Sequence, residues 1–200
     1  MSLPKNFFAH FILALNNDLG QDTVQVILLK AGLDAGLANP RSVSRLDADF
    51  LPQTYADMQM AIQSYFGRGA RGILLRIGRL LWPMLLADAS FLIRFYAQTI
   101  RILPVSLRLR PSLELLAGFL RGEAGQVTIH SLDMDWMLAD KDFAPLVKDA
   151  RDSLACYITL GLIQECLFWA CGREVDVTET SCRARGGDAC EFLIKHIYRD

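Results

Sequence analysis

Five cysteines are the residues of this chain best suited to chemistry, and all of them lie in its last 45 residues. Cys182 and Cys190 flank a Gly-Gly-Asp segment at 186–188, a composition typical of a hairpin loop. Two thiolates on either side of such a loop converge in the way that paired metal ligands do. Cys156 lies upstream on a predicted helix, and its thiol can join the pair if that helix packs on the hairpin.

Three thiolates leave one position of a tetrahedral zinc site open, and zinc accepts a carboxylate there. Asp133, Asp135 and Glu179 are the acids nearby. Glu179 stands three residues before the second cysteine on a predicted strand, so strict alternation turns its side chain away from that cysteine. The alternative is that the thiols only fill the core, which is how we interpret Cys166 and Cys171, with their bulky apolar neighbours.

Other reactive patterns are absent from the sequence. No CxxC pair is present, which excludes a zinc ribbon and a thioredoxin-type redox motif. The histidines His10, His130 and His196 are dispersed and form no HExxH. Glycines 67, 69 and 72 follow a predicted helix rather than a strand, so they are no dinucleotide fingerprint, and no flavin or iron–sulfur motif is visible. The sequence therefore shows no hydride source for a reductase.

The elements that must position the cysteines form a helical part and a mixed part. The texture changes at Gly122, after which two strands around 126–138, a long helix over 143–171 and a strand pair at 175–180 and 190–197 are predicted. We expect one α+β domain over 1–200, with helices to about 121 and the sheet, long helix and cysteine hairpin over about 122–200. The helical part is predicted at 5–17, 21–33, 52–66, 71–86, 89–103 and 112–121.

Two stretches resemble a known family. The C-terminal VDVTETSCRARGGDACEFLI (175–194) and, less specifically, YADMQMAIQSYFGRGARGILLRIGR (55–79) are similar to the 4-vinyl-reductase domain family, over roughly 20–197. That family includes bacteriochlorophyll-synthesis accessory proteins, hydrocarbon-binding proteins and the sensor domains of phenol- and xylene-responsive activators. The resemblance implies a helical N-terminal two-thirds packed on a small antiparallel sheet, like the TRAPP subunits and the haem nitric-oxide sensors.

The resemblance also implies a metal site and an assembly. The family's sensor domains bind zinc through three cysteines and an upstream acid, and Cys156, Cys182 and Cys190 match the cysteine pattern. The acid falls at Asp135, where the family has glutamate, so Asp133 or Glu179 remain alternatives. Such a site is closed to water and is expected to be structural. The family implies a homodimer through the N-terminal helices, for which we predict the face of phenylalanines 7, 8 and 11.

The expected ligand is an apolar small molecule, aromatic or a tetrapyrrole. We expect most aromatic residues of the middle third, such as Phe91, Phe95 and Trp82, to lie in the core. The family implies an apolar cavity, and His130, Trp136 and Tyr157 are candidate anchors, since each carries a polar atom on an apolar body. The prediction is a stand-alone sensor or carrier; the alternative is an accessory protein or reductase for the 4-vinyl group in bacteriochlorophyll biosynthesis.

Charge and hydropathy limit the partners. The chain has 200 residues and a formal net charge of −1, which gives no general attraction to nucleic acid. Nine arginines and no lysine lie between Arg68 and Arg121, against two acids. These arginines either pair with the acidic C-terminal third or meet an anionic ligand or membrane surface. No apolar run approaches the roughly 20 residues of a membrane span, and no signal peptide is evident, so we predict a cytoplasmic protein.

Overall fold

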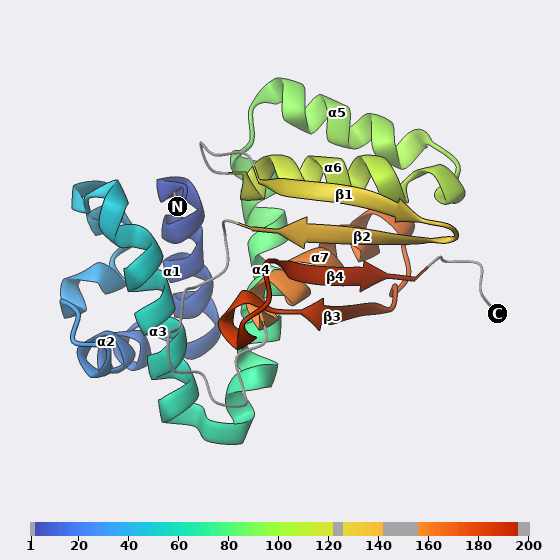
Figure 1. Cartoon of the computed structure of the whole chain (residues 1–200). Helices are drawn as coiled ribbons and strands as arrows, with labels where there is room; N and C mark the ends of the chain where they lie inside the picture. The colour runs from blue at the N-terminus through green and yellow to red at the C-terminus, as the bar shows by residue number, and fades with distance from the viewer. Residues whose placement is uncertain (1–2, 122–125, 142–155, 196–200) are drawn as a thin grey trace.

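The computed structural model describes residues 3–121, 126–141 and 156–195. Its helices and strands follow the predicted order of a helical part, a strand pair, a helix and a second strand pair (Figure 1). The long helices of the first part are α1 (Lys5–Leu19), α2 (Gln21–Lys30), α3 (Leu51–Phe66), α4 (Ala70–Asp88), α5 (Phe91–Ile102) and α6 (Leu109–Leu120). Short 3-10 turns connect them: η1 (Ala35–Ala38), η2 (Pro40–Arg45), η3 (Ala48–Phe50), η4 (Gly67–Gly69) and η5 (Val105–Leu107).

The C-terminal part is a four-stranded antiparallel sheet with one helix. Its elements are β1 (Val127–Leu132), β2 (Asp135–Asp140), α7 (Tyr157–Cys171), β3 (Val177–Ser181), the turn η6 (Arg183–Arg185) and β4 (Cys190–Ile194). The strand order is β1-β2-β4-β3, so β4 lies between β2 and β3. The predicted α+β class, with helices packed on a small antiparallel sheet, is therefore confirmed. Of the long helix predicted over 143–171, α7 is the described portion; the rest lies outside the described residues.

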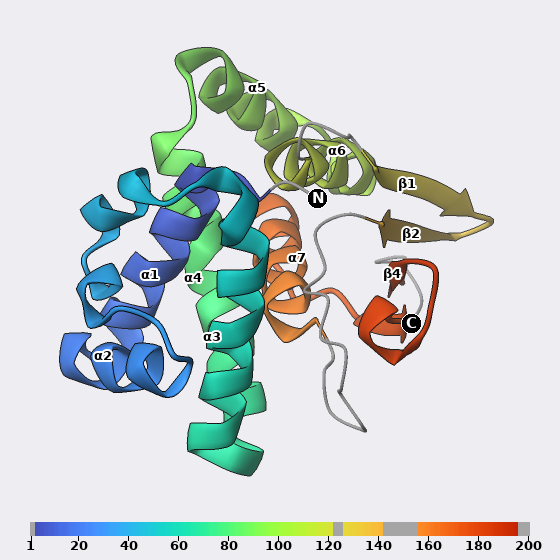
Figure 2. The same cartoon turned by 60° about the vertical axis from the view of Figure 1, so that its left-hand side comes forward.

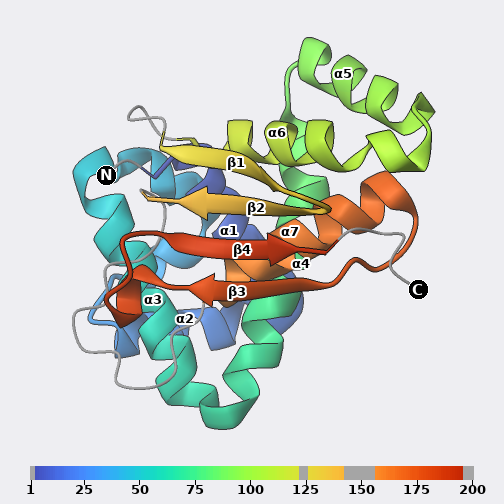
Figure 3. The same cartoon turned by 45° about the vertical axis from the view of Figure 1, so that its right-hand side comes forward.

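The described helices lie on one side of the sheet, which faces the viewer in Figure 3. α7 packs against α4, α6 and the sheet strand β3, and α6 also contacts β1. Figure 2 shows α7 between the N-terminal helices and the strands. Ten of the 15 residues of α7 are buried, and they surround the helix rather than forming a stripe. A helix that is apolar all round belongs in the core.

The helices α4 and α7 meet backbone to backbone through two glycines. A Cβ atom on Gly161 would lie 2.1 Å from the carbonyl oxygen of Leu75, and one on Gly78 would lie 2.1 Å from that of Ile158. Real Cβ atoms essentially never approach closer than 3.0 Å. Only glycine therefore permits this crossing, which fixes α7 and the residue before it against the helical part.

The N-terminal helix is inside the molecule, which corrects one prediction. Phe7, Phe8 and Phe11 are at most 1% exposed, and the rings of Phe7 and Phe11 contact Tyr55 of α3 edge-on. Helices α2, α3 and α4 pack around α1. The face that we predicted for a homodimer contact is thus covered by the chain itself.

A second correction concerns the aromatic residues of the middle third. Trp82 is buried and its ring meets those of Phe119 and Trp169 at 5.8 and 5.5 Å, as expected for a core residue. Phe91 and Phe95, in contrast, are 72% and 61% exposed on α5. Only Ala97 and Ile100 of that helix are buried, because α5 lies on the outside of α6. The helix therefore presents most of its large apolar side chains to solvent.

Candidate metal centre

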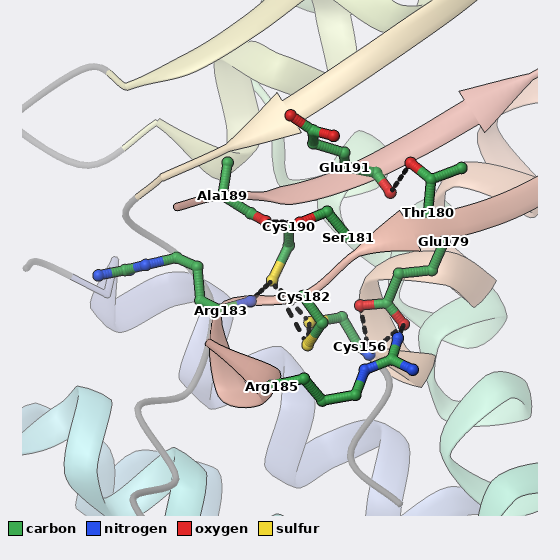
Figure 4. Close-up of polar contacts among 10 residues, drawn as sticks. All are labelled: Cys156, Glu179, Thr180, Ser181, Cys182, Arg183, Arg185, Ala189, Cys190 and Glu191. Carbon is green, nitrogen blue, oxygen red and sulfur yellow. Dashed lines mark hydrogen bonds and ion pairs between the residues drawn. The ribbon is translucent and has the colours of Figure 1, made fainter. Parts of the chain in front are cut away.

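Three cysteines that are distant in the sequence meet at one end of the sheet (Figure 4). Cys156 immediately precedes α7, Cys182 follows β3, and Cys190 begins β4. The Sγ atom of Cys156 lies 3.2 Å from that of Cys190 and 3.9 Å from that of Cys182, and the Cys182 and Cys190 sulfurs are 3.9 Å apart. All three side chains are buried and none forms a disulfide. The structure thus brings together the three cysteines predicted to converge.

The fourth member of the cluster is Glu179 of β3. One carboxylate oxygen of Glu179 and the three sulfurs all lie within 4.8 Å of one another. The backbone N–H of Cys156 donates to both carboxylate oxygens, at 3.2 and 3.1 Å, and the guanidinium of Arg185 lies 3.8 Å from one of them. The glutamate side chain is only 5% exposed. Three separate elements therefore supply four donor atoms to one small volume.

A bulge in β3 explains why Glu179 faces the cysteines. Glu179 pairs with Phe192, but Ser181 pairs with Glu191, so two residues of β3 oppose one residue of β4. The extra residue reverses the alternation that follows, and Cys182 lands on the same face as Glu179. The prediction that Glu179 faces away assumed strict alternation and is corrected by this bulge.

Asp135, the predicted fourth ligand, lies elsewhere. It begins β2 and pairs with Leu132 near the turn of the first hairpin, whereas Asp140, at the other end of the same strand, pairs with Cys190. Five residues of extended chain separate the two ends by roughly 17 Å. The structure therefore does not bring Asp135 to the cysteines, and Asp133, in the turn before it, is equally distant from them in register.

The environment of the cluster separates the proton affinities of its members. Contacts with Cys182 and Cys190, and then burial, raise the pKa of the Cys156 thiol, while contacts with Cys156 and Cys190 lower the pKa of Cys182. Cys156 lowers the pKa of Cys190, but Cys182 and burial outweigh it and raise that pKa to about 12. Burial raises the pKa of Glu179 to about 7. Negative charge in the metal-free cluster is thus concentrated on Cys182.

Basic and polar groups of the hairpin turn surround these sulfurs. The backbone N–H of Arg183 donates to the Cys190 sulfur at 3.4 Å, and the turn η6 is held by N–H groups of Arg185 and Gly187 that bond to the Cys182 carbonyl oxygen at 3.0 Å. Gly186 closes the turn in the left-handed conformation, with φ of 89°. The turn therefore fixes the separation of the two hairpin cysteines.

Tyr55 and Asp140 are site neighbours that the sequence did not single out. Tyr55 is buried on α3; burial, and then the charges of Cys156 and Asp140, raise the pKa of its phenol. Asp140 is 1% exposed. Neither residue stands in a recognisable motif, and their proximity to the cysteines follows only from the packing of α3 against the end of the sheet.

The remaining cysteines behave as predicted. Cys166 is fully buried in α7, where its sulfur lies 3.4 Å from the carbonyl oxygen of Ser112, and Cys171 is 8% exposed at the end of the same helix. Burial raises the pKa of both thiols. Both therefore pack in the core, outside the four-residue cluster.

The three predicted ligand anchors lie apart from one another. Tyr157, the first residue of α7, stacks under the guanidinium of Arg71 at 5.6 Å and lines a hollow of about 390 Å³. His130 is exposed on β1, where its Nε2 lies 2.9 Å from the Thr128 hydroxyl, and lines a different hollow of about 480 Å³. Trp136 of β2 lies under the guanidinium of Arg110, at 5.9 Å.

The arginine-rich segment pairs only in part with the acidic C-terminal third. Arg79 contacts Glu174 at 2.5 Å and Glu165 at 3.3 Å. Arg76 instead pairs with Asp18 of α1, and Arg110 with the neighbouring Glu114. Within the described residues, the other six arginines of this segment form no ion pair with a carboxylate.

Solved structures share the fold over nearly the whole chain. A Fe(II) unliganded H-NOX protein mutant from K. algicida is 12% identical, with a TM-score of 0.56, and the alignment covers 98% of this chain and 96% of that one. A structure from a study of heme distortion in the H-NOX family is 15% identical, with a TM-score of 0.53 and coverage of 99% and 97%. At such identities the similarity establishes the fold alone.

Sequence comparisons are informative at the C-terminal end. No curated protein matches the chain. The family model of the 4-vinyl-reductase (4VR) domain matches residues 145–196, the segment that carries Cys156, Glu179, Cys182 and Cys190. Over this segment, the predicted resemblance to the 4-vinyl-reductase domain family is therefore confirmed.

Proposed function

We propose that Cys156, Cys182, Cys190 and Glu179 hold one zinc ion that has a structural role. Zinc–sulfur bonds of about 2.3 Å in a tetrahedron place neighbouring sulfurs roughly 3.8 Å apart. The three sulfur separations of 3.2, 3.9 and 3.9 Å are close to that value. This agreement, together with a carboxylate in the fourth position, is the observation that supports the site.

The donor set favours a structural role over catalysis. Four protein ligands leave no position for a water molecule or a substrate on a tetrahedral ion. Three thiolates and one carboxylate exceed the charge of the ion by two, and the neighbouring Arg183 and Arg185 offset that excess. An ion held there joins the start of α7 to the β3–β4 hairpin, which otherwise meet only through side-chain packing.

Elemental analysis tests the zinc site. Protein purified without chelator should contain one zinc per chain, and Cys182→Ser should lose it. Cys171→Ser is the matched control, because that thiol is also buried but lies outside the cluster. Metal-free wild-type protein that also fails to take up added zinc in an equilibrium titration would refute the site.

We infer that the domain binds an apolar small molecule that carries an acidic group, as a sensor or a carrier. The hollow of about 390 Å³ beside Tyr157 supports this inference. It is at the small end of the usual range for ligand pockets. Arg68 and Arg71 line it, and so does the side chain of Gln63, whose buried amide nitrogen has no hydrogen-bond partner in the described structure. These donors suit a carboxylate, and the Tyr157 ring suits an apolar body.

The neighbouring metal site gives this hollow a defined wall. Tyr157 directly follows Cys156, so an ion on Cys156 fixes the first turn of α7 and the ring that borders the hollow. Binding energies of structural zinc are of order 10 kcal/mol in small peptides, which is ample to order such a turn. The proposed zinc therefore supports ligand binding through position rather than chemistry.

A tetrapyrrole with propionate groups is one ligand of this class. The described histidines offer it no axial ligand from the core: His10 bonds to Asp88 at the surface, and His130 is exposed on β1. Binding by arginine–carboxylate pairing requires no such ligand. The match to the 4VR family model supports the same ligand for the alternative function, an accessory protein or reductase for the 4-vinyl group of bacteriochlorophyll precursors.

Titrations with a magnesium porphyrin and with phenol, followed by tryptophan fluorescence, separate carrier from phenol-type sensor. Tyr157→Ala and Arg71→Gln should each weaken binding of the bound compound at least tenfold, because the first removes an apolar contact and the second a charged hydrogen bond. His130→Ala, in the other hollow, is the control. A ligand that is lost with His130→Ala but not with Tyr157→Ala would refute this location.

A further inference from the structure

Helix α5 and the turn after it carry an unusual concentration of exposed apolar side chains. Phe91, Leu92, Phe95 and Ile102 are 72, 76, 61 and 82% exposed, and Leu107 of η5 is 60% exposed. Elsewhere in the described residues, only two large apolar side chains are as exposed, and they lie on separate elements, α2 and η3. Large contiguous apolar patches on a protein surface mark interaction sites. We call these five side chains the α5 ridge.

The α5 ridge forms one stripe of the helix, and arginines lie beside it. Phe91, Phe95 and Ile102 are spaced by four and seven residues, which places them on a common face. Ala97 and Ile100 are buried on the opposite side. Figures 1 and 2 show that this helix lies on the outside of the molecule, beyond α6. The ridge is therefore convex and unpartnered within the described chain.

The charge around the α5 ridge has one sign. Arg94, Arg101, Arg108 and Arg110 lie between residues 89 and 113, and this stretch contains no aspartate or glutamate. Arg110 has a carboxylate partner, Glu114, which is itself outside the stretch. Arg94 and Arg101 are seven residues apart, so they form a row along the edge of the exposed stripe. An occupant of this face must be apolar and anionic together.

We propose that the α5 ridge lies flat on the surface of an anionic phospholipid bilayer. Phenylalanine and leucine side chains on a basic amphipathic helix enter the boundary between headgroups and acyl chains, while arginines reach the phosphates. A second copy of the chain suits the face poorly, because a twofold contact would place the arginines of both copies against one another. The proposal is independent of the zinc site and of the ligand hollow.

The geometry indicates a surface contact and not a span. The 12 residues of α5 extend for about 18 Å, well short of the roughly 30 Å of a bilayer core. No single described helix is long and apolar enough to cross a membrane. Helix α5 passes such a test only together with the preceding helical segment Ala48–Asp88, from which it is bent by 119°. The helix is thus suited to lie along a membrane.

Vesicle co-sedimentation tests the proposal directly. The full chain should bind vesicles of phosphatidylcholine and phosphatidylserine mixed two to one, and bind phosphatidylcholine vesicles at least tenfold more weakly. High salt should weaken the first interaction, because it screens the arginines. Absence of binding to the mixed vesicles, or equal binding to both, would overturn the proposal.

Two apolar substitutions test the ridge itself. The double variant Phe91→Ser with Phe95→Ser should weaken vesicle binding at least tenfold, because both rings would leave the membrane. Phe50→Ser is the matched control, since that ring is 65% exposed on η3, away from α5. Both proteins should unfold thermally like the wild type, as these side chains are outside the core. An equal effect of the control would refute the assignment.

Charge substitutions and oligomeric state complete the test. Arg94→Gln with Arg101→Gln should weaken binding by about fivefold for each arginine, and Arg41→Gln with Arg45→Gln should leave it unchanged. Light scattering after gel filtration examines the other occupants. A wild-type dimer that the phenylalanine pair dissociates, without any binding of the chain to vesicles, would assign the ridge to a second copy and overturn the proposal.

Discussion

Replacing Gly161 by alanine tests the helix crossing that holds the metal site against the helical part. The new Cβ would lie 2.1 Å from the Leu75 carbonyl oxygen and 3.0 Å from its carbonyl carbon. Both are backbone atoms in the middle of α4, so no side chain can rotate away. Reaching even 3.0 Å from the oxygen requires the two helices to separate by about 0.9 Å. That gap weakens the dispersion contacts along the whole crossing.

The expected loss follows from two opposing contributions. Overpacking of a core costs about 1–3 kcal/mol, and a backbone contact belongs at the upper end or beyond. Alanine in place of glycine returns about 1 kcal/mol through helix propensity. We therefore expect Gly161→Ala to lower the free energy of unfolding by about 2 kcal/mol. With a urea m-value of about 2 kcal/mol/M, the midpoint should fall by about 1 M.

Other helical glycines provide the controls. Gly78→Ala creates the reciprocal clash with Ile158 and should behave like Gly161→Ala. A Cβ atom added to Gly72 or Gly118 would have no atom within 4 Å, so alanine at either site should raise the urea midpoint by up to about 0.5 M. The reasoning fails if Gly161→Ala and Gly72→Ala shift the midpoint in the same direction.

Three further predictions concern the site and its supports. Glu179→Gln should weaken zinc binding at least tenfold in a competition titration, and Asp135→Asn should leave it unchanged; the reverse order would restore the aspartate as ligand. Arg79→Met should lower the free energy of unfolding by about 1 kcal/mol at low salt and by less in high salt, and a loss that does not change with salt would argue against the ion pairs. Deleting Thr180, next to Glu179 in the bulge, should abolish zinc binding in protein that circular dichroism shows to be folded.

The sequence predicts the cysteine cluster well because its information is local. A Gly-Gly-Asp loop between Cys182 and Cys190 requires a tight turn, and a turn between two strands brings its flanking residues together. The helix that follows Cys156 is apolar on all sides and must be buried, which places that thiol beside the sheet. The same kind of pattern predicts the α+β class, since the period of the apolar residues changes after residue 121.

Features that depend on which surfaces meet are beyond such patterns. Phe7, Phe8 and Phe11 define an apolar face, but periodicity does not say whether the chain's own helices or a second copy covers it. The apolar residues of α5 have a similar helical period and remain exposed. The crossing at Gly161 is equally invisible in the sequence, because a glycine in a helix is ordinarily only a local cost.

The identity of the fourth ligand shows how one residue of register decides a site. On a regular strand, Glu179 and Cys182 lie on opposite faces, and an acid from β2 is the natural alternative. The bulge opposite Glu191 adds one residue, and the carboxylate then joins the sulfurs from the same strand. The hydroxyls of Thr180 and Ser181 bond to the carbonyl oxygens of Glu191 and Ala189, which ties the irregular segment to β4. The bulge thus acts as part of the site, because it turns a carboxylate that would face away toward the position that three thiols leave open.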